Sequence, residues 1–411
     1  MPIRWRDAMS GALYGAGGFF VAGTGPADHF RTSVHASPAF ATALLRLLTQ
    51  VDRALGHPSR LDVVDVGAGR GELLLALTGL AVGVSGEPAH SGRSGFIPPW
   101  SGSPETPTPT TSARLSLAER VRFTAVEYAP RPENLPQKIN WTAEIPDGIT
   151  GLLIATEWLD NVPLDTAVHT EAGWRYLLVD PETGAETIGE HVTAEDHDWL
   201  ARWWPHTSTA ANSDRTAPST APDTTSGSES GFGAARPAQG SSLTARSRSD
   251  CPETPHRHHR AEIGRTRDEA WASAVQKMER GLAVAVDYGH LRAGRPVDGT
   301  LTGYRDGRQV HPIPDGSSDV TAHVAMDSVA SAGAAVARCA YSLVSQRKAL
   351  RALGADGGRP PLSLAGTDPA GYVRALAAAS TVAELTDPAG LGGHWWLRQP
   401  VGIPPEPPVA R

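Results

Sequence analysis

The feature that most constrains this chain is a short apolar run that ends in closely spaced glycines. The stretch reads LDVVDVGAGRGELLLAL, from Leu61 to Leu77. Its first part is typical of a buried strand, and the pattern after the glycines is helical. In an open α/β sheet, the first turn from strand to helix is where the backbone comes closest to a ligand. The stretch therefore predicts a wound α/β sheet with a ligand site at this turn.

Other short apolar runs supply the rest of the predicted sheet. They begin at Val121 (VRFTAV), Gly151 (GLLIA), Trp174 (WRYLLV) and Leu282 (LAVAVDYG). Near-continuous apolar runs between turn residues are typical of buried parallel strands. Helical patterns at 37–55 and 268–280 separate some of these runs. This alternation of strands and helices predicts the α/β class.

Two segments of low complexity interrupt the pattern. Residues 206–250 offer only Phe232 and Leu243 as large apolar side chains, too few to offset the entropy lost on ordering. Residues 90–112 are rich in Pro and Thr, which disfavour a helix interior. We therefore expect both segments to be disordered inserts. The expected organisation is an N-terminal helical segment (1–60), a first part of the main domain (61–205, with the insert 90–112), a disordered insert (206–260) and the remainder of the domain (261–411).

Charge and cysteine content argue against several classes of protein. A formal net charge of -7 disfavours nucleic acid or an anionic membrane as the main partner. Cys251 and Cys339 lie too far apart to form a disulfide framework, which favours a reducing compartment. No apolar run has the length of a membrane span or a signal peptide. We expect a cytoplasmic protein.

The spacing of the glycines narrows the class of ligand. Gly67, Gly69 and Gly71 are spaced G-x-G-x-G. A dinucleotide fingerprint needs its third glycine where Glu72 stands, and a carboxylate there would repel a pyrophosphate. A nucleoside without phosphates fits better, and S-adenosylmethionine is the common ligand of this kind. A purely structural turn would have the same sequence.

A second acid supports a nucleoside site. Glu127 ends the apolar run RFTAV, and a carboxylate at the end of the neighbouring strand can accept hydrogen bonds from both ribose hydroxyls. Glu127 follows Gly71 at much more than the usual spacing of about 20 positions, and the segment 90–112 accounts for the excess. The alternative is a solvent-facing glutamate that ends a strand.

Further motifs resemble, in order, those of the MidA-like family of S-adenosylmethionine-dependent methyltransferases. This family includes the mitochondrial complex I assembly factor that methylates an arginine. The motifs are RDAMSGALYGAGGFF, ADHFRTSVHASPAF, VVDVGAGRGELL, VEYAP, TEWLDNVPLD, AVDYGH, GTLTGYRDGRQV, SSDVTAHV, SQRKALRALG and GLGGHWWL. The resemblance implies a Rossmann-like methyltransferase sheet, preceded by a family-specific N-terminal helical segment. It also implies methyl transfer to an arginine of a protein partner.

The resemblance implies roles for particular residues. Gly67, Gly69 and Gly71 shape the cofactor pocket, and Glu127 holds the ribose. Glu157 and Asp160, in TEWLDNVPLD, offer a carboxylate pair that suits a guanidinium. The alternative for one of the two acids is a cap on the turn before Pro163.

Four further residues are candidates for the part of the site that binds the methyl acceptor. Asp28, Thr32 and Ser33 lie in a polar N-terminal loop of the kind that closes over a site, although such residues also cap helices. Asp287 ends the run LAVAVD and is a candidate for the rim, with a structural role equally open. No metal site is expected.

Departures from the family pattern leave the acceptor open. Thr156 stands where the family has Asn, and Asp65 where it usually has Glu. Because the acids of the motifs are retained, we expect cofactor binding to be kept. The alternatives to an arginine are another protein side chain or a small molecule. A binding or assembly factor that keeps the fold without catalysis is the alternative from another class.

Overall fold

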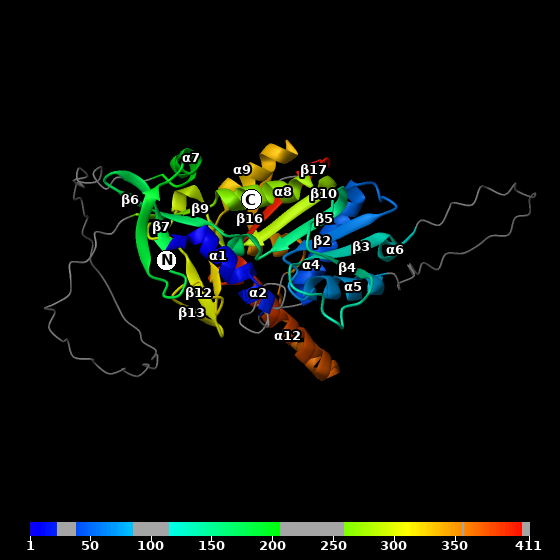
Figure 1. Ribbon diagram of the computed structural model, residues 1–411. Helices are drawn as coiled ribbons and strands as arrows, with labels where there is room; N and C mark the ends of the chain where they lie inside the picture. Colours follow the sequence, from blue (N-terminus) through cyan, green and yellow to red (C-terminus); the bar gives the residue numbers. More distant parts are fainter. Residues whose placement is uncertain (23–37, 85–114, 206–258, 356, 405–411) are drawn as a thin grey trace, which may run out of the picture.

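The computed structural model describes residues 1–22, 38–84, 115–205, 259–355 and 357–404 as a large wound sheet with a smaller sheet beside it (Figure 1). The expected insert 90–112 lies outside the described residues, as does the expected insert 206–260 apart from its last two residues. Arg260 already belongs to a strand. The candidates Asp28, Thr32 and Ser33 also lie outside the described residues.

The central sheet has the strand order β16-β17-β10-β5-β2-β3-β4. Its strands are β2 (Leu61–Val66), β3 (Val121–Val126), β4 (Ile139–Thr142), β5 (Ile149–Thr156), β10 (Met278–Asp287), β16 (Ser342–Ser345) and β17 (Trp395–Val401). The strands from β10 to β4 are parallel, and β17 is antiparallel to both β10 and β16. This confirms the predicted α/β class. The carboxyl ends of β2, β3, β5 and β10 share one edge, where open α/β sheets bind ligands.

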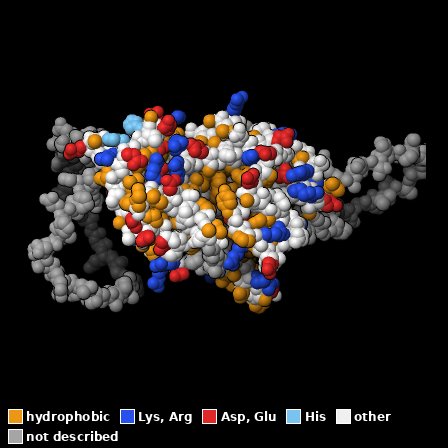
Figure 2. All heavy atoms as spheres, in the orientation of Figure 1, with side chains coloured by type: hydrophobic (Ala, Val, Ile, Leu, Met, Phe, Trp, Pro, Cys, Tyr) orange, Lys and Arg blue, Asp and Glu red, His pale blue; other side chains and the backbone are white. Residues whose placement is uncertain are grey.

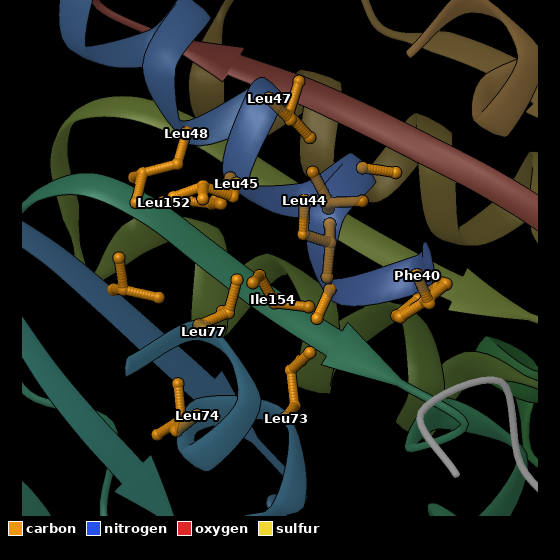
Figure 3. Close-up of a cluster of buried hydrophobic side chains, with 14 of the residues drawn as sticks. Phe40, Leu44, Leu45, Leu47, Leu48, Leu73, Leu74, Leu77, Leu152 and Ile154 are labelled. Atoms are coloured by element: carbon orange, nitrogen blue, oxygen red, sulfur yellow. The ribbon is translucent and has the colours of Figure 1, made fainter. Parts of the chain in front are cut away.

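Helices cover both faces of this sheet. On one face lie α4 (Pro38–Ala54) and α5 (Glu72–Val84), and on the other lie α8 (Arg265–Gln276) and α9 (Met326–Ala337). Strand β5 serves both faces because successive side chains of a strand point to opposite sides. Leu152 and Ile154 pack among side chains of α4 and α5 (Figure 3), whereas Leu153 and Ala155 belong to the cluster that includes α8 and α9.

The remaining helices lie around these layers. They are α1 (Trp5–Tyr14), α2 (Phe19–Ala22), α6 (Leu117–Arg120), α7 (Ala194–Trp203), α10 (Gln346–Ala352), α11 (Leu362–Thr367) and α12 (Pro369–Leu385), with short 3-10 turns η2 (Leu159–Asn161), η4 (Arg292–Gly294) and η5 (Leu391–Gly393). No helix in the described part of the chain combines the length and apolar character that a membrane crossing requires.

The second sheet corrects one sequence-based expectation. It is antiparallel and contains β1 (Ile3–Arg4), β6 (Asp165–Thr170), β7 (Gly173–Val179), β8 (Glu186–His191) and β9 (Arg260–Ile263). The run from Trp174, expected in the parallel sheet, is β7 of this sheet. Leu177 packs with α1 on one face and Tyr176 with α7 on the other. A strand buried on both faces has the same apolar sequence in either kind of sheet.

Both predicted helices are present, but only the first has the bounds that its sequence pattern predicts. The pattern at 37–55 is α4, which begins at Pro38 and ends at Ala54. The pattern expected at 268–280 is α8, which ends at Gln276. The carbonyl of Lys277 accepts a 3.1 Å hydrogen bond from the amide of Ile149, and Met278 begins β10. Tertiary pairing with β5 therefore ends the helix earlier than its sequence pattern does.

Two small sheets bring the loops after β10 together. Strand β11 (Gly289–His290) pairs with β15 (Val324–Ala325), and β12 (Thr302–Arg305) pairs with β13 (Arg308–Val310) and β14 (Asp319–Thr321). Residues 288–290 consequently lie beside 319–325 at the carboxyl edge of the central sheet.

Candidate functional site

A cavity of about 1390 Å³ lies at the carboxyl edge of the central sheet. Its wall is contributed by segments far apart in the sequence, from Tyr14 of α1 to His394 before β17. Figure 2 shows apolar side chains across the middle of one face of the molecule, with charged side chains mostly to either side. The cavity thus lies where the sequence predicted a ligand site.

The glycine loop joins β2 to α5 and forms part of the cavity wall. Gly67, Gly69 and Gly71 have φ angles of +71°, +58° and +82°, which glycine adopts without strain. The amide of Gly67 donates to the carbonyl of Val126 at 3.0 Å, which ties the loop to β3. Gly67 and Gly69 line the cavity. Gly71 lies behind the loop, where a Cβ would come within 3.0 Å of Leu135.

Glu127 lies beside this loop at the end of β3. One carboxylate oxygen, Oε2, accepts a 3.0 Å hydrogen bond from the amide of Gly69. The other, Oε1, accepts from the amides of Tyr128 at 2.8 Å and Ala129 at 3.2 Å. Burial raises the pKa of this carboxyl, against the effect of these three hydrogen bonds. The candidate ribose ligand is therefore held rigidly next to the candidate cofactor loop.

A further acid, Asp65, lies next to the glycine loop. Asp65, on β2, is 3% exposed and lines the cavity. Burial, with the nearby charges of Glu72 and Glu127, raises the pKa of Asp65 to about 8. The raised pKa favours the protonated form of Asp65, which can donate a hydrogen bond.

Glu157 has an unusual backbone conformation. It follows β5 directly, has a φ of +52° and lines the cavity. Its amide donates to the carbonyl of Val286 at 2.8 Å, which fixes it at the end of β10. A left-handed conformation costs a residue with a Cβ about 1–2 kcal/mol. Such strain persists where the surrounding structure enforces it and clusters at functional sites.

Asp160, the other acid of the predicted pair, lies deeper. It is 3% exposed and lines the cavity. Its Oδ2 accepts a 2.7 Å hydrogen bond from the Thr321 hydroxyl and another from the Tyr288 hydroxyl. Among the described residues, its Oδ1 has no hydrogen-bond partner. Burial raises the pKa of Asp160.

Asp287, a candidate for the rim whose structural role the sequence left equally open, does not line the cavity and lies beneath it. It is 1% exposed, and its Oδ2 accepts hydrogen bonds from the amides of Leu159 at 3.0 Å and Asp160 at 3.3 Å. The carboxylate therefore holds the first turn of η2. Burial, then the charges of Asp160 and Glu157, raise the pKa of Asp287 well above its ordinary value.

Sequence reasoning missed Arg267, which joins the parts of the acidic site. Its guanidinium, on α8, is buried and donates to the carbonyls of Val162 at 3.1 Å, Ala322 at 2.9 Å and His323 at 3.1 Å, and to that of Asp160. One cation thus connects α8, η2 and the loop after β14. No sequence signal distinguishes it from Arg265, the half-buried arginine of the same helix.

Asp319 and Tyr14 complete the wall. Asp319 accepts a 2.6 Å hydrogen bond from the amide group of Asn161, and its pKa is raised well above the ordinary value, mainly by burial. The Tyr14 hydroxyl donates to the carbonyl of Asn161 at 3.3 Å. Its ring lies 5.7 Å from those of Phe20 and Tyr128. The N-terminal helices therefore contact both the acidic part of the cavity and the residue after Glu127.

Comparison with known proteins assigns the chain to a family. A family profile described as "putative S-adenosyl-L-methionine-dependent methyltransferase" matches residues 111–343, more than half of the chain. The chain belongs to this family. The cofactor of this methyltransferase is S-adenosylmethionine, as the sequence predicted. No curated protein matches the sequence.

Solved structures show the same fold. Two crystal structures of proteins from Burkholderia thailandensis are 18% identical to this methyltransferase, with a TM-score of 0.63. The matches cover 98% of this chain, and 89% and 88% of the other two chains. One of the two structures holds S-adenosyl-homocysteine. The likeness confirms the Rossmann-like methyltransferase fold. In the described part of this chain, no group of His, Cys, Asp and Glu side chains is arranged to hold a metal ion.

Proposed function

We propose that this methyltransferase transfers the methyl group of S-adenosylmethionine to an arginine side chain of a protein partner in the cytoplasm. The observation that carries the proposal is the number of carboxyl groups around the cavity. Its described lining contains two cationic side chains, Arg70 and Lys277, against seven carboxyl groups: Asp65, Glu72, Glu127, Glu144, Glu157, Asp160 and Asp319. Burial raises the pKa of several of these carboxyls, and a cationic acceptor is the ligand that would favour their ionised form.

The glycine loop and Glu127 fit the nucleoside part of the cofactor. A Cβ at Gly69 would meet only the Glu72 carboxylate, at 3.6 Å, so the backbone is open to a ligand there. Glu127 offers its carboxylate to the ribose hydroxyls from the same wall. Gly67 and Gly71 keep the loop in the conformation that leaves this space. When bound, the cofactor supplies an electrophilic methyl group on a sulfonium.

Glu157 and Asp160 are placed to hold the acceptor. A guanidinium donates two parallel hydrogen bonds to a carboxylate, which fixes its plane. Glu157 lines the cavity directly after β5, and we assign its carboxyl group to the acceptor. Asp160 has a raised pKa, and the approach of a cation would favour its ionised form. Ligand pockets usually have volumes of about 300–1000 Å³, so this cavity of about 1390 Å³ is large enough for a cofactor and a side chain together.

Replacing Glu127 by alanine should weaken binding of S-adenosylmethionine about 10- to 100-fold, because a charge-assisted hydrogen bond contributes about 1.5–3 kcal/mol. Isothermal titration calorimetry with S-adenosylmethionine measures this directly. Glu133→Ala, which changes an acid in the loop between β3 and β4 that does not line the cavity, is the control. Equal affinity for wild type and Glu127→Ala would remove Glu127 from the cofactor site.

Replacing Glu157 by glutamine should reduce methyl transfer about 100-fold, by analogy with the loss of one oriented polar group at a reacting centre. Cofactor affinity and melting temperature should change little, because the amide is nearly isosteric. Asp160→Asn should show a milder loss. The measurement is transfer from tritiated cofactor to proteins of the source cell, with mass spectrometry of the labelled side chains.

The same experiment separates the alternatives. Label on methylated arginine supports the proposal, and label confined to another side chain or to small molecules contradicts the arginine acceptor. Complementation tests the non-catalytic alternative. If a transfer-dead Glu157→Gln protein fully restores the phenotype of a deletion strain, binding is the physiological role and catalysis is not.

A further inference from the structure

Two histidine rings flank Tyr288 on the wall of the cavity. The His323 ring lies 5.2 Å from the Tyr288 ring in an edge-on arrangement, and the His394 ring lies 5.5 Å from it. The Tyr288 hydroxyl is hydrogen-bonded to the Asp160 carboxylate. All four side chains line the cavity. Both imidazoles therefore pack against the tyrosine that binds Asp160, one of the two carboxylates to which we assign the acceptor.

The two histidines differ in their access to the cavity. His323 is exposed, whereas His394 is half-buried. The backbone of His323 is fixed on both sides, since its amide donates to the Thr300 hydroxyl at 2.8 Å and its carbonyl accepts from Arg267 at 3.1 Å. No hydrogen bond within the described ranges involves the His323 ring. The main chain of His323 is therefore fixed at the cavity wall, and its ring nitrogens are available to a ligand.

Methyl transfer to a guanidinium releases a proton. The guanidinium nitrogen attacks the methyl carbon, the bond from carbon to sulfur breaks, and the electron pair remains on sulfur in S-adenosyl-homocysteine. The alkylated nitrogen must then lose one proton. Carboxylates that bind the guanidinium through hydrogen bonds are already engaged in positioning it, so a separate group on the cavity wall is better suited to accept the proton.

We propose that His323 is the catalytic residue that takes this proton from the methylated nitrogen and passes it to solvent in the cavity. The inference rests on the proposed function, because it assumes a nitrogen acceptor beside Glu157 and Asp160.

The groups that face His323 keep it neutral at pH 7. Although the residue is partly exposed, desolvation by the surrounding cavity wall is the largest effect and lowers the pKa of His323 below the ordinary value of 6.5. The charges of Glu262 and Asp160 oppose this shift of the pKa, and that of Arg267 adds to it. The neighbouring rings are those of Tyr288, at 5.2 Å, and His290, at 6.4 Å. The pKa of His394 is lowered to about 4, mainly by burial, so it is neutral as well. The base form of His323 is therefore present at neutral pH and is lost as the pH falls through its lowered pKa.

The first test uses a pool of synthetic peptides, each with one central arginine, and tritiated S-adenosylmethionine. His323→Gln should lower kcat at pH 7 by about 100-fold or more, as expected for loss of a general base. The affinity for S-adenosyl-homocysteine should stay within about twofold, because the residue is assigned to the proton and not to the cofactor. His197→Gln, on the surface helix α7, is the control and should keep the wild-type kcat.

The pH profile and chemical rescue distinguish a base from a structural residue. Wild-type kcat should fall about tenfold per pH unit on the acid side of the lowered pKa, and this limb should be absent from His323→Gln. Free imidazole should restore kcat to His323→Gly but not to Glu157→Gln. A wild-type kcat in His323→Gln, or an acid limb that survives the substitution, would overturn the proposal.

A parallel pool with one central lysine separates failure of this inference from failure of the proposed function. Transfer by wild type to lysine and not to arginine peptides contradicts the arginine acceptor. The kcat of wild type and His323→Gln with lysine peptides then tests whether His323 is the base. A readout without turnover is acylation of neutral imidazole by diethylpyrocarbonate, mapped by mass spectrometry. His323 should react readily and be protected by S-adenosyl-homocysteine together with the peptide pool that wild type methylates. An unreactive His323, or one that the ligands do not protect, contradicts the assignment.

Discussion

Replacing Arg267 by methionine should lower the free energy of unfolding by about 3–5 kcal/mol, the usual cost of removing one partner from a buried charged network. The guanidinium is 1% exposed and donates to carbonyls on both sides of the acidic site. Methionine fills similar space but leaves these carbonyls without donors. It also removes the buried positive charge beside Asp160 and Asp287, whose carboxyls it stabilises.

Urea denaturation of wild type and variant measures the loss. Arg374→Met is the matched control, because that side chain is 73% exposed on α12 and lies 3.7 Å from Asp368. Its substitution should change stability by no more than about 0.5 kcal/mol. A loss below about 1 kcal/mol in Arg267→Met would contradict a large contribution of this network to the free energy of unfolding.

Replacing Gly281 by alanine should destabilise the protein by about 3 kcal/mol or more, because overpacking of this severity forces a backbone shift. Gly281 lies on β10 opposite Gly151 of β5. A Cβ on Gly281 would stand 1.9 Å from the carbonyl oxygen of Gly151, and the φ of +138° is itself unfavourable for other residues. The strands at the centre of the sheet would have to separate.

Gly79→Ala is the control for this prediction. Gly79 lies in α5, and no atom lies within 4 Å of the position that its Cβ would take. Alanine in a helix interior is favoured over glycine by about 0.5–1 kcal/mol, so this variant should be slightly more stable than wild type. Thermal unfolding of both variants provides the comparison. If Gly281→Ala melts at the wild-type temperature, the close pairing of β5 and β10 is wrong.

The sequence predicted the features that depend on local pattern. The strand, glycine and helix sequence of residues 61–77 is specific because glycine is needed wherever φ is positive, and all three glycines of the loop have such angles. Glu127 lies beside Gly69, although the segment 90–112 separates them in the chain, because parallel neighbours β2 and β3 end at the same edge.

The sequence could not predict features that depend on tertiary contacts and on the direction in which a side chain points. Asp287 ends a strand beside the site, but only the fold shows that its carboxylate points beneath η2 toward backbone amides. The apolar run at Trp174 has the composition of a parallel strand because both its faces are covered, and its partners are antiparallel. Arg267 resembles an ordinary helix arginine until the buried carbonyls around it are known. Glu157 carries no sequence mark of its strained backbone.

The position of β17 has a consequence for synthesis of the enzyme. This strand pairs with β10 along its length and inserts between β10 and β16, and the cavity residues 389–394 come directly before it. Contacts between such distant segments form late, because they must wait for the whole intervening chain. A nascent chain on the ribosome therefore lacks a complete cavity until Val401 has emerged. Methyl transfer at this site can therefore begin only after that strand has left the ribosome and paired with β10.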